Sequence, residues 1–177
     1  MFEGKKIKIR AYNEKDTNRI LELISEKGIR ETLSVEAIFP YSFENEKSFV
    51  NSAMNCRDEL FNFVIEELGT KDIIGGCGIN EMDRKNSVAT IGIWLGKEFH
   101  GKGFASDTLR VLCSFIFDEL NVNKVKLDYF DFNDAGKKCY ESVGFIQEGV
   151  HRKEIFRYGK YHDKISMGLF RNELKKI

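Results

Sequence analysis

The sequence predicts an α+β domain of three layers, in which a mixed, mostly antiparallel sheet of about seven strands is flanked by four helices. Two observations predict this class. Three β-rich runs follow one another with only short turn clusters between them, as in an antiparallel meander, and a strand–loop–helix–strand unit follows, as in a parallel crossover. With 177 residues, 42% of them hydrophobic, one domain over residues 1–177 can bury its own core.

The front half of the chain is expected to hold one strand and two helices. Charged residues alternate with apolar ones across 6–10, which is the period of a half-buried strand. A helix capped at Asp16-Thr17 and closed by Gly28 follows. A second helix is expected over 44–59, with its inward residues at Phe49, Ala53 and Cys56.

The back half supplies the remaining elements through its β-branched, aromatic and helical-period runs. We expect strands at 60–67, 73–80 and 88–95, a helix at 103–120, a strand at 125–129, a short helix at 135–142, and strands at about 145–156 and 161–170.

Composition narrows the function classes. The 28 basic and 28 acidic residues cancel, and no basic stripe carries interleaved aromatics, so a nucleic-acid partner is not expected. The four cysteines form no C-x-x-C pair and are typical of free thiols in a reducing cytoplasm. No apolar run approaches the roughly 18 residues of a membrane span, so no membrane partner is expected either.

The loop after the third meander strand is the strongest functional signal. In His100-Gly-Lys-Gly-Phe-Ala105, glycines at 101 and 103 allow a tight turn that brings backbone N–H groups together at a helix N-terminus. Lys102 can add a salt contact. A plain helix cap is the alternative. The spacing excludes a P-loop and a dinucleotide-binding βαβ fingerprint, so a nucleotide-sized diphosphate is the expected ligand.

Two motifs together resemble the GNAT superfamily of acyl-CoA N-acyltransferases. The family's R/Q-x-x-G-x-G/A loop corresponds to His100-x-x-Gly103-x-Ala105, with a histidine at the first position, and its N-x₆-Y-x₃-G-F segment corresponds to residues 133–145. The stretch 93–99 and the tail around 149–163 look most similar to the Rim-type, ribosomal-protein-acetylating branch and its polyamine-acetylating relatives.

The resemblance implies acetyl-CoA as cosubstrate and an N-acetyltransferase activity. By position it implies a cofactor-binding set of Trp94, Leu95, His100, Gly101, Lys102, Gly103, Phe104, Ala105, Ser106 and Asn133. In the family, a splayed strand before the loop supplies a backbone N–H to the thioester oxygen, and Trp94-Leu95 is that strand end here. Asn133 is expected to order its loop or to contact the pantetheine arm.

Tyr140 is the candidate catalytic residue. The resemblance places it beside the CoA sulfur, where a phenol of pKa about 10 can protonate a thiolate of pKa about 8.5. Core packing on a short helix is the alternative. The base is not identified, because residues 88–92 lack the glutamate that relatives often carry. Glu81, Glu36 and Asp128 stay open as substitutes, and neither His151 nor His162 is a better candidate.

The acceptor is expected near the irregular, apolar segment 33–43. Ile38-Phe39 stands where polyamine-acetylating relatives carry acidic residues, which favours a peptide or protein N-terminus over a polyamine or other small amine.

A non-catalytic acyl-CoA sensor is the alternative from another class. No metal is expected, since the three histidines are scattered. The sequence leaves open whether the chain forms a homo-oligomer.

Overall fold

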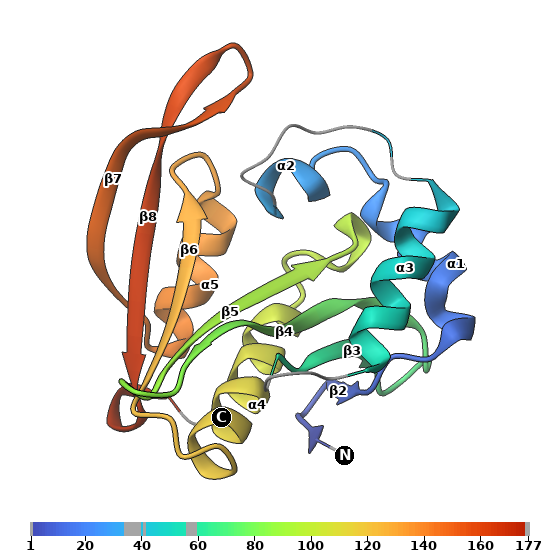
Figure 1. The fold of residues 1–177 in the computed structure, drawn as a ribbon, viewed down its shortest axis with the longest axis horizontal. Helices are drawn as coiled ribbons and strands as arrows, with labels where there is room; N and C mark the ends of the chain where they lie inside the picture. Colours follow the sequence, from blue (N-terminus) through green and yellow to red (C-terminus); the bar gives the residue numbers. More distant parts are fainter. Residues whose placement is uncertain (1, 34–39, 41, 56–59, 176–177) are drawn as a thin grey trace.

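One mixed sheet organises the molecule, and the computed structural model describes residues 2–33, 40, 42–55 and 60–175. The strand order is β1-β2-β3-β4-β5-β6-β8-β7, and all neighbours are antiparallel except β5 and β6 (Figure 1). The strands are β1 (Phe2–Glu3), β2 (Ile7–Arg10), β3 (Asn62–Glu67), β4 (Ile73–Asp83), β5 (Val88–Leu95), β6 (Lys124–Phe130), β7 (Ile146–Arg157) and β8 (Lys160–Phe170). The α+β class is confirmed.

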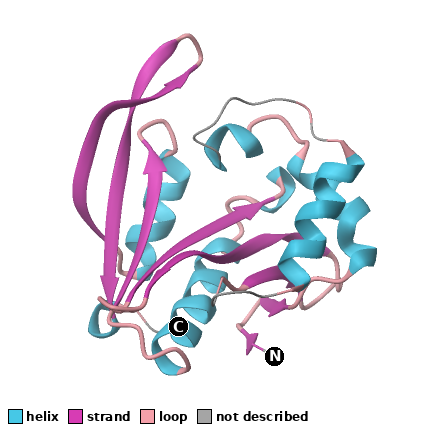
Figure 2. Cartoon of the chain, in the orientation of Figure 1, coloured by secondary structure: helices cyan, strands magenta, loops and turns pink. Residues whose placement is uncertain are grey.

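Helices cover both faces of the sheet (Figure 2). They are α1 (Thr17–Ile24), α2 (Ile29–Leu33), α3 (Phe43–Met54), α4 (Phe104–Asp118) and α5 (Asp134–Val143). Neighbouring residues of a strand point to opposite faces, and on β3 Val64 joins the core formed with α1 and α3 while Ile65 joins the core formed with α4 and α5. The predicted three-layer arrangement follows.

The described chain holds eight strands and five α-helices, where the sequence predicts seven and four. The additional elements are β1 and α2. With two and five residues they are too short to show a period in the sequence. The first helix also ends at Ile24, before the predicted stop at Gly28, and Asn13 and Asp16 form a capping box just before it.

The prediction for α3 is partly wrong. Ser42 caps this helix, and Val50 and Ala53 are its buried apolar residues, with 0% and 4% exposed surface. Phe49 is 42% exposed, and its ring makes an edge contact with Tyr12, at 5.7 Å between ring centroids. Ala53 is therefore inward as predicted, Phe49 is not, and Cys56 lies outside the described residues.

The sheet opens between β5 and β6. These strands pair at only three positions, from Val88 with Lys124 to Thr90 with Lys126. Beyond Thr90, β5 continues beside β4, while β6 continues beside β8, so the two strands diverge (Figure 1). We call this wedge-shaped opening the fork. It splits the sheet at the point where the predicted crossover joins its two halves.

Two findings bear on the predicted environment. Cys77, Cys113 and Cys139, the three cysteines that the structure describes, are free thiols. No helix among the described residues is long and apolar enough to cross a bilayer.

Candidate functional site

The loop between β5 and α4 gathers backbone N–H groups at one point. Gly101 and Gly103 have φ angles of 73° and 84°, in the left-handed region that glycine adopts without strain. Gly103 is the N-cap of α4. Among the described residues, Asp107 is the first residue of this helix whose backbone N–H bonds a carbonyl, the Gly103 oxygen at 3.1 Å. The N–H groups of 103–106 thus face outward, where the helix dipole favours an anion.

Lys6 reaches this loop from the turn between β1 and β2, a contact that the sequence did not predict. Its Nζ donates to the carbonyl oxygen of Lys102 at 2.7 Å and lies 6.0 Å from the centroid of the Phe104 ring. Its backbone N–H donates to the Asp107 carboxylate, also at 2.7 Å, and Asp107 is only 4% exposed. An ammonium group is therefore held at the edge of the amide cluster.

The other loop side chains fix its shape. Phe104 is buried and packs edge-on against Phe99, at 6.2 Å between centroids, which anchors the start of α4. The Ser106 hydroxyl donates to the Gly103 carbonyl at 3.0 Å, and Ala105 packs against the core. These contacts leave the backbone as the anion-facing part of the loop.

His100 is bonded within the loop. Its Nε2 lies 2.9 Å from the carbonyl oxygen of Leu95, and since a carbonyl only accepts, this nitrogen carries the hydrogen. The imidazole therefore ties the loop to the end of β5. Trp94 packs against both cores, and glycine at 76 makes room for it, because a Cβ there would lie 2.8 Å from the Trp94 Nε1.

Tyr140 lies on α5 beside the open part of β6. Its ring packs against Tyr129 and Phe145, at 5.8 and 6.3 Å between centroids. Tyr129 follows Lys126, the last β6 residue paired with β5, by three positions, so the phenol lies next to the fork. Burial raises the pKa of Tyr140 above its ordinary value, and the neighbouring Cys139 and Tyr129 add to this.

Asn133 caps α5. Its side-chain oxygen accepts a hydrogen bond from the backbone N–H of Gly136 at 3.0 Å. A Cβ at position 136 would lie 2.7 Å from the Asn133 Nδ2, so a larger residue there would displace the capping side chain. The contact fits the expectation that Asn133 orders its loop.

Among the candidate bases, Asp128 borders the fork. It lies on β6 two residues beyond Lys126, and its carboxylate accepts a hydrogen bond from the Ser166 hydroxyl at 2.6 Å. The Ser166 oxygen in turn lies 3.1 Å from the Nε2 of His151. A polar chain therefore runs across β6, β8 and β7, and it joins two residues that the sequence treated separately.

The other candidate bases are less well placed. Glu81 pairs with Thr90 from β4, a strand that does not border the fork. Glu36 lies outside the described residues. His162 is buried, with its Nδ1 2.7 Å from the Asp131 carboxylate near the end of β6.

Comparison with known proteins decides the family. A family model described as "Acetyltransferase (GNAT) domain" matches residues 6–146. The chain belongs to the GNAT acetyltransferases.

Three named GNAT-like proteins are similar to this one. The SPbeta prophage-derived uncharacterized N-acetyltransferase YokL of Bacillus subtilis (strain 168) is 32% identical over 176 residues, which cover 98% of this chain and 95% of that protein. The provisionally named ribosomal N-acetyltransferase YdaF of the same organism is 32% identical over 101 residues, 57% of this chain and 55% of its own. The solved structure of spermidine N-acetyltransferase from Vibrio cholerae in complex with CoA and spermine is 27% identical, with a TM-score of 0.83 over 94% of this chain and 96% of that one.

As a GNAT acetyltransferase, the protein is an acetyl-CoA-dependent enzyme. The sensor alternative is therefore not carried further. The residues present fit this donor, because a diphosphate requires several converging N–H groups and the outward-facing amides of 103–106 supply them. The fork opens immediately before that loop in the chain, so an extended arm has an open strand edge to lie along.

The expected acceptor segment of this GNAT protein is only partly described. Residues 34–39 and 41, which include Ile38-Phe39, lie outside the described part. The short helix α2 just before them is tied to the turn between β7 and β8, where the Tyr158 hydroxyl donates to the Glu31 carboxylate. The turn between β7 and β8 and α2 are thus in contact.

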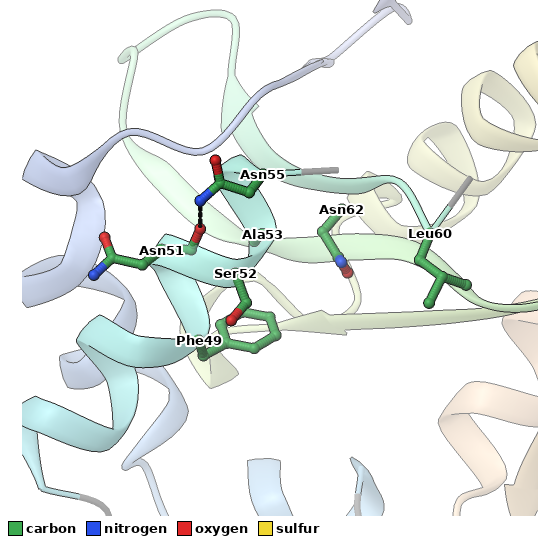
Figure 3. Close-up of a pocket in the computed structure, with 7 residues that line it drawn as sticks. All are labelled: Phe49, Asn51, Ser52, Ala53, Asn55, Leu60 and Asn62. Atoms are coloured by element: carbon green, nitrogen blue, oxygen red, sulfur yellow. Dashed lines mark hydrogen bonds between the residues drawn. The ribbon is translucent and has the colours of Figure 1, made fainter. Parts of the chain in front are cut away.

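A hollow of about 460 Å³ lies elsewhere, between α3 and β3 (Figure 3). It is lined by Phe49, Asn51, Ser52, Ala53, Asn55, Leu60 and Asn62. None of these residues can serve as an acid or a base near neutral pH, and none belongs to the loop, the fork strands or α5. No three His, Cys, Asp or Glu side chains among the described residues gather to hold a metal ion. This hollow is therefore not a candidate for the chemistry, and the fork is kept as the candidate site.

Proposed function

We propose that this GNAT enzyme transfers the acetyl group to a primary amine, by direct attack of the amine on the thioester at the fork. One observation carries the proposal. Asp128 and Tyr129 are consecutive on β6 at the fork edge, so their side chains point to opposite faces, and Tyr129 contacts Tyr140. A base and an acid therefore flank one opening in the sheet.

The loop would hold the donor through its backbone. Residues 103–106 offer N–H groups to the pyrophosphate, and the ammonium groups of Lys6 and Lys102 lie at the rim of this site. Trp94-Leu95 ends the strand at the fork and supplies the backbone donor for the developing oxyanion. His100 supports the site indirectly, by fixing the loop to Leu95.

Tyr140 supplies the proton to the departing CoA thiolate. An acid must be protonated at the start of the step, and burial raises the pKa of this phenol, which keeps it protonated at neutral pH. The phenol lies on the α4–α5 side of the sheet, whereas Asp128 lies on the other side. The donor and the acceptor would thus approach from opposite faces.

Asp128 takes the proton from the attacking ammonium, directly or through water. A lysine-like amine titrates at about 10.4 and an α-amine at about 7.7–8.0, so most acceptors must be deprotonated on the enzyme. The hydrogen bond from the Ser166 hydroxyl, at 2.6 Å, holds this carboxylate in place at the fork. The exposed edge position of Asp128 leaves it open to an incoming amine.

Two acceptor classes are proposed. A peptide or protein N-terminus is favoured by the apolar pair Ile38-Phe39 and by the similarity to YdaF. A polyamine or other small amine is the second candidate, because the Vibrio cholerae neighbour is a spermidine N-acetyltransferase. Thiol release from acetyl-CoA, measured over a panel of short peptides and of mono-, di- and polyamines, tests both. No release with any primary amine would refute the proposed function.

A further inference from the structure

Asp131 and His162 form a hydrogen-bonded pair that has no role in the proposed acid–base chemistry. His162 on β8 is 6% exposed, and its Nδ1 lies 2.7 Å from one Asp131 oxygen. The second Asp131 oxygen accepts the backbone N–H of Asp163 at 3.0 Å. Although partial burial opposes it, these two hydrogen bonds lower the pKa of Asp131. Asp131 is thus an ionised carboxylate that accepts a hydrogen bond from His162, so the Nδ1 of His162 carries a hydrogen.

This arrangement fixes what the other ring nitrogen can bind. In a neutral imidazole with hydrogen on Nδ1, Nε2 is an acceptor. The Nε2 of His162 is buried and has no hydrogen-bond partner among the described residues. A buried polar atom without a partner is rare and requires an explanation, such as a bound donor group. An N–H-bearing ligand is complementary to it.

Aromatic rings and carboxylates near His162 can receive a cationic N–H group, while Lys160 and Arg157 bring positive charge near Asp131 and Tyr158. The rings of Phe132 and Tyr158 lie 4.7 and 6.4 Å from the His162 ring, between centroids, and both can contact an ammonium through their faces. The Asp131 carboxylate is bonded to His162 itself, and the Glu31 carboxylate is bonded to the neighbouring Tyr158. In Figure 1 the end of β6, the β7–β8 hairpin and α2 surround the wide end of the fork.

The pair is too far from Asp128 to act on the same amino group. Ser166 on β8 bonds Asp128, the proposed base. His162 lies on the same strand, four residues before Ser166. At about 3.3 Å per residue, this separation is roughly 13 Å. A single small amine cannot reach both places, but an acceptor with two amino groups can.

We infer that His162, held by Asp131, binds a second, protonated amino group of the acceptor while the first is acetylated at the fork. The substrate class is then a linear diamine or polyamine, or a peptide whose lysine side chain supplies the second amine. The inference rests on the proposed function for the identity of the fork as the reacting end.

Two substitutions at His162 separate its two nitrogens. His162→Asn keeps an amide N–H near the Nδ1 position, bonded to Asp131, and removes Nε2. His162→Gln places an amide group near Nε2. The exposed Tyr161→Phe on the same strand is the matched control, since Tyr161 is 64% exposed and has no part in the site. Melting temperatures verify that all three variants fold.

The measurement compares 1,8-diaminooctane with octylamine, first by calorimetric binding to the CoA-saturated protein and then by thiol release. We expect the diamine to bind about tenfold more tightly, and His162→Asn to remove that preference while octylamine binding changes less than twofold. His162→Gln should retain part of the preference. Equal affinity of the wild-type protein for both amines, or equal losses for both in His162→Asn, would overturn the inference.

Calorimetric binding tests the role of His162 even if no amine is acetylated. A lack of acetylation would refute only the proposed function. Peptides that differ by lysine or norleucine at the third position identify the source of the second amine. If the lysine peptide binds more tightly only when His162 is present, a peptide side chain occupies the site. If the diamine alone discriminates, a free polyamine occupies it.

Discussion

Replacement of Tyr140 by phenylalanine removes one hydroxyl and leaves the rest of the ring in place. Phenylalanine keeps the contacts with Tyr129 and Phe145 at 5.8 and 6.3 Å, and no described residue hydrogen-bonds the phenol oxygen. The free energy of unfolding should therefore change by less than about 1 kcal/mol. Loss of a general acid lowers turnover by about 10²–10⁴-fold, equivalent to roughly 3–5 kcal/mol of activation free energy.

The assay is thiol release at saturating acetyl-CoA, with the donor dissociation constant measured separately. We expect kcat to fall at least a hundredfold and acetyl-CoA affinity to stay within about threefold, because the phenol acts on the leaving sulfur and the loop amides hold the diphosphate. An unchanged kcat would refute the acid role. A matching loss of donor affinity would instead assign Tyr140 to binding.

The pH profile gives an independent check of the same reasoning. Burial raises the pKa of Tyr140 above its ordinary value of 10.0, so the phenol keeps its proton as the pH rises from 7 to about 9.5. The acid therefore causes no decline of kcat over that range. A decline in the wild-type enzyme that disappears in Tyr140→Phe would mean that the phenol ionises there and would contradict the structure.

Three further substitutions test the other parts of the site. Asp128→Asn should lower kcat/KM at least tenfold at pH 7, with a smaller loss as the pH approaches the amine pKa of about 10.4, where the acceptor is neutral without help; a pH-independent loss would count against a base. Gly103→Ala puts a side chain at a φ of 84°, so the free loop should relax away from this conformation. Restoring it on binding costs about 1–2 kcal/mol, so calorimetry should show acetyl-CoA binding roughly five- to thirtyfold weaker; unchanged affinity would argue against the amide cradle. Asp107→Ala leaves the N–H groups of Lys6 and Ile7 without their acceptor and should lower the melting temperature by about 5–15 °C; a shift under about 2 °C would show that this buried carboxylate is dispensable.

The sequence predicted elements best where local chemistry is strong. The run Val88–Leu95 is β-rich and lies between turn clusters, and its bounds agree with β5. Gly103 and Gly144 mark the start of α4 and the end of α5, because glycine adopts the backbone angles found there. The sequence did not predict β1 and α2, because elements this short show no hydrophobic period.

The site was less predictable because its partners are distant in the chain. The hydrogen bond from Lys6 to Asp107 joins residues 101 positions apart, and Asp131 and His162 are 31 apart. Their proximity depends on strand order and on the register of β6 with β8, which no local pattern specifies. In the sequence His162 is therefore one of three scattered histidines, with no local sign of its partner. The phosphate loop, in contrast, is continuous in sequence and was predicted as a unit.

The fork also has a kinetic consequence. The fork divides the sheet into two parts, β1–β5 and β6–β8, which are joined by three residue pairs at one end. Helices α4 and α5 pack against each other. A thioester arm between the two parts of the sheet would satisfy their open backbone edges and fix their spacing. The surface that meets the amine is then complete only after the donor has bound. Ordered addition, with acetyl-CoA first, is the kinetic scheme that this architecture favours.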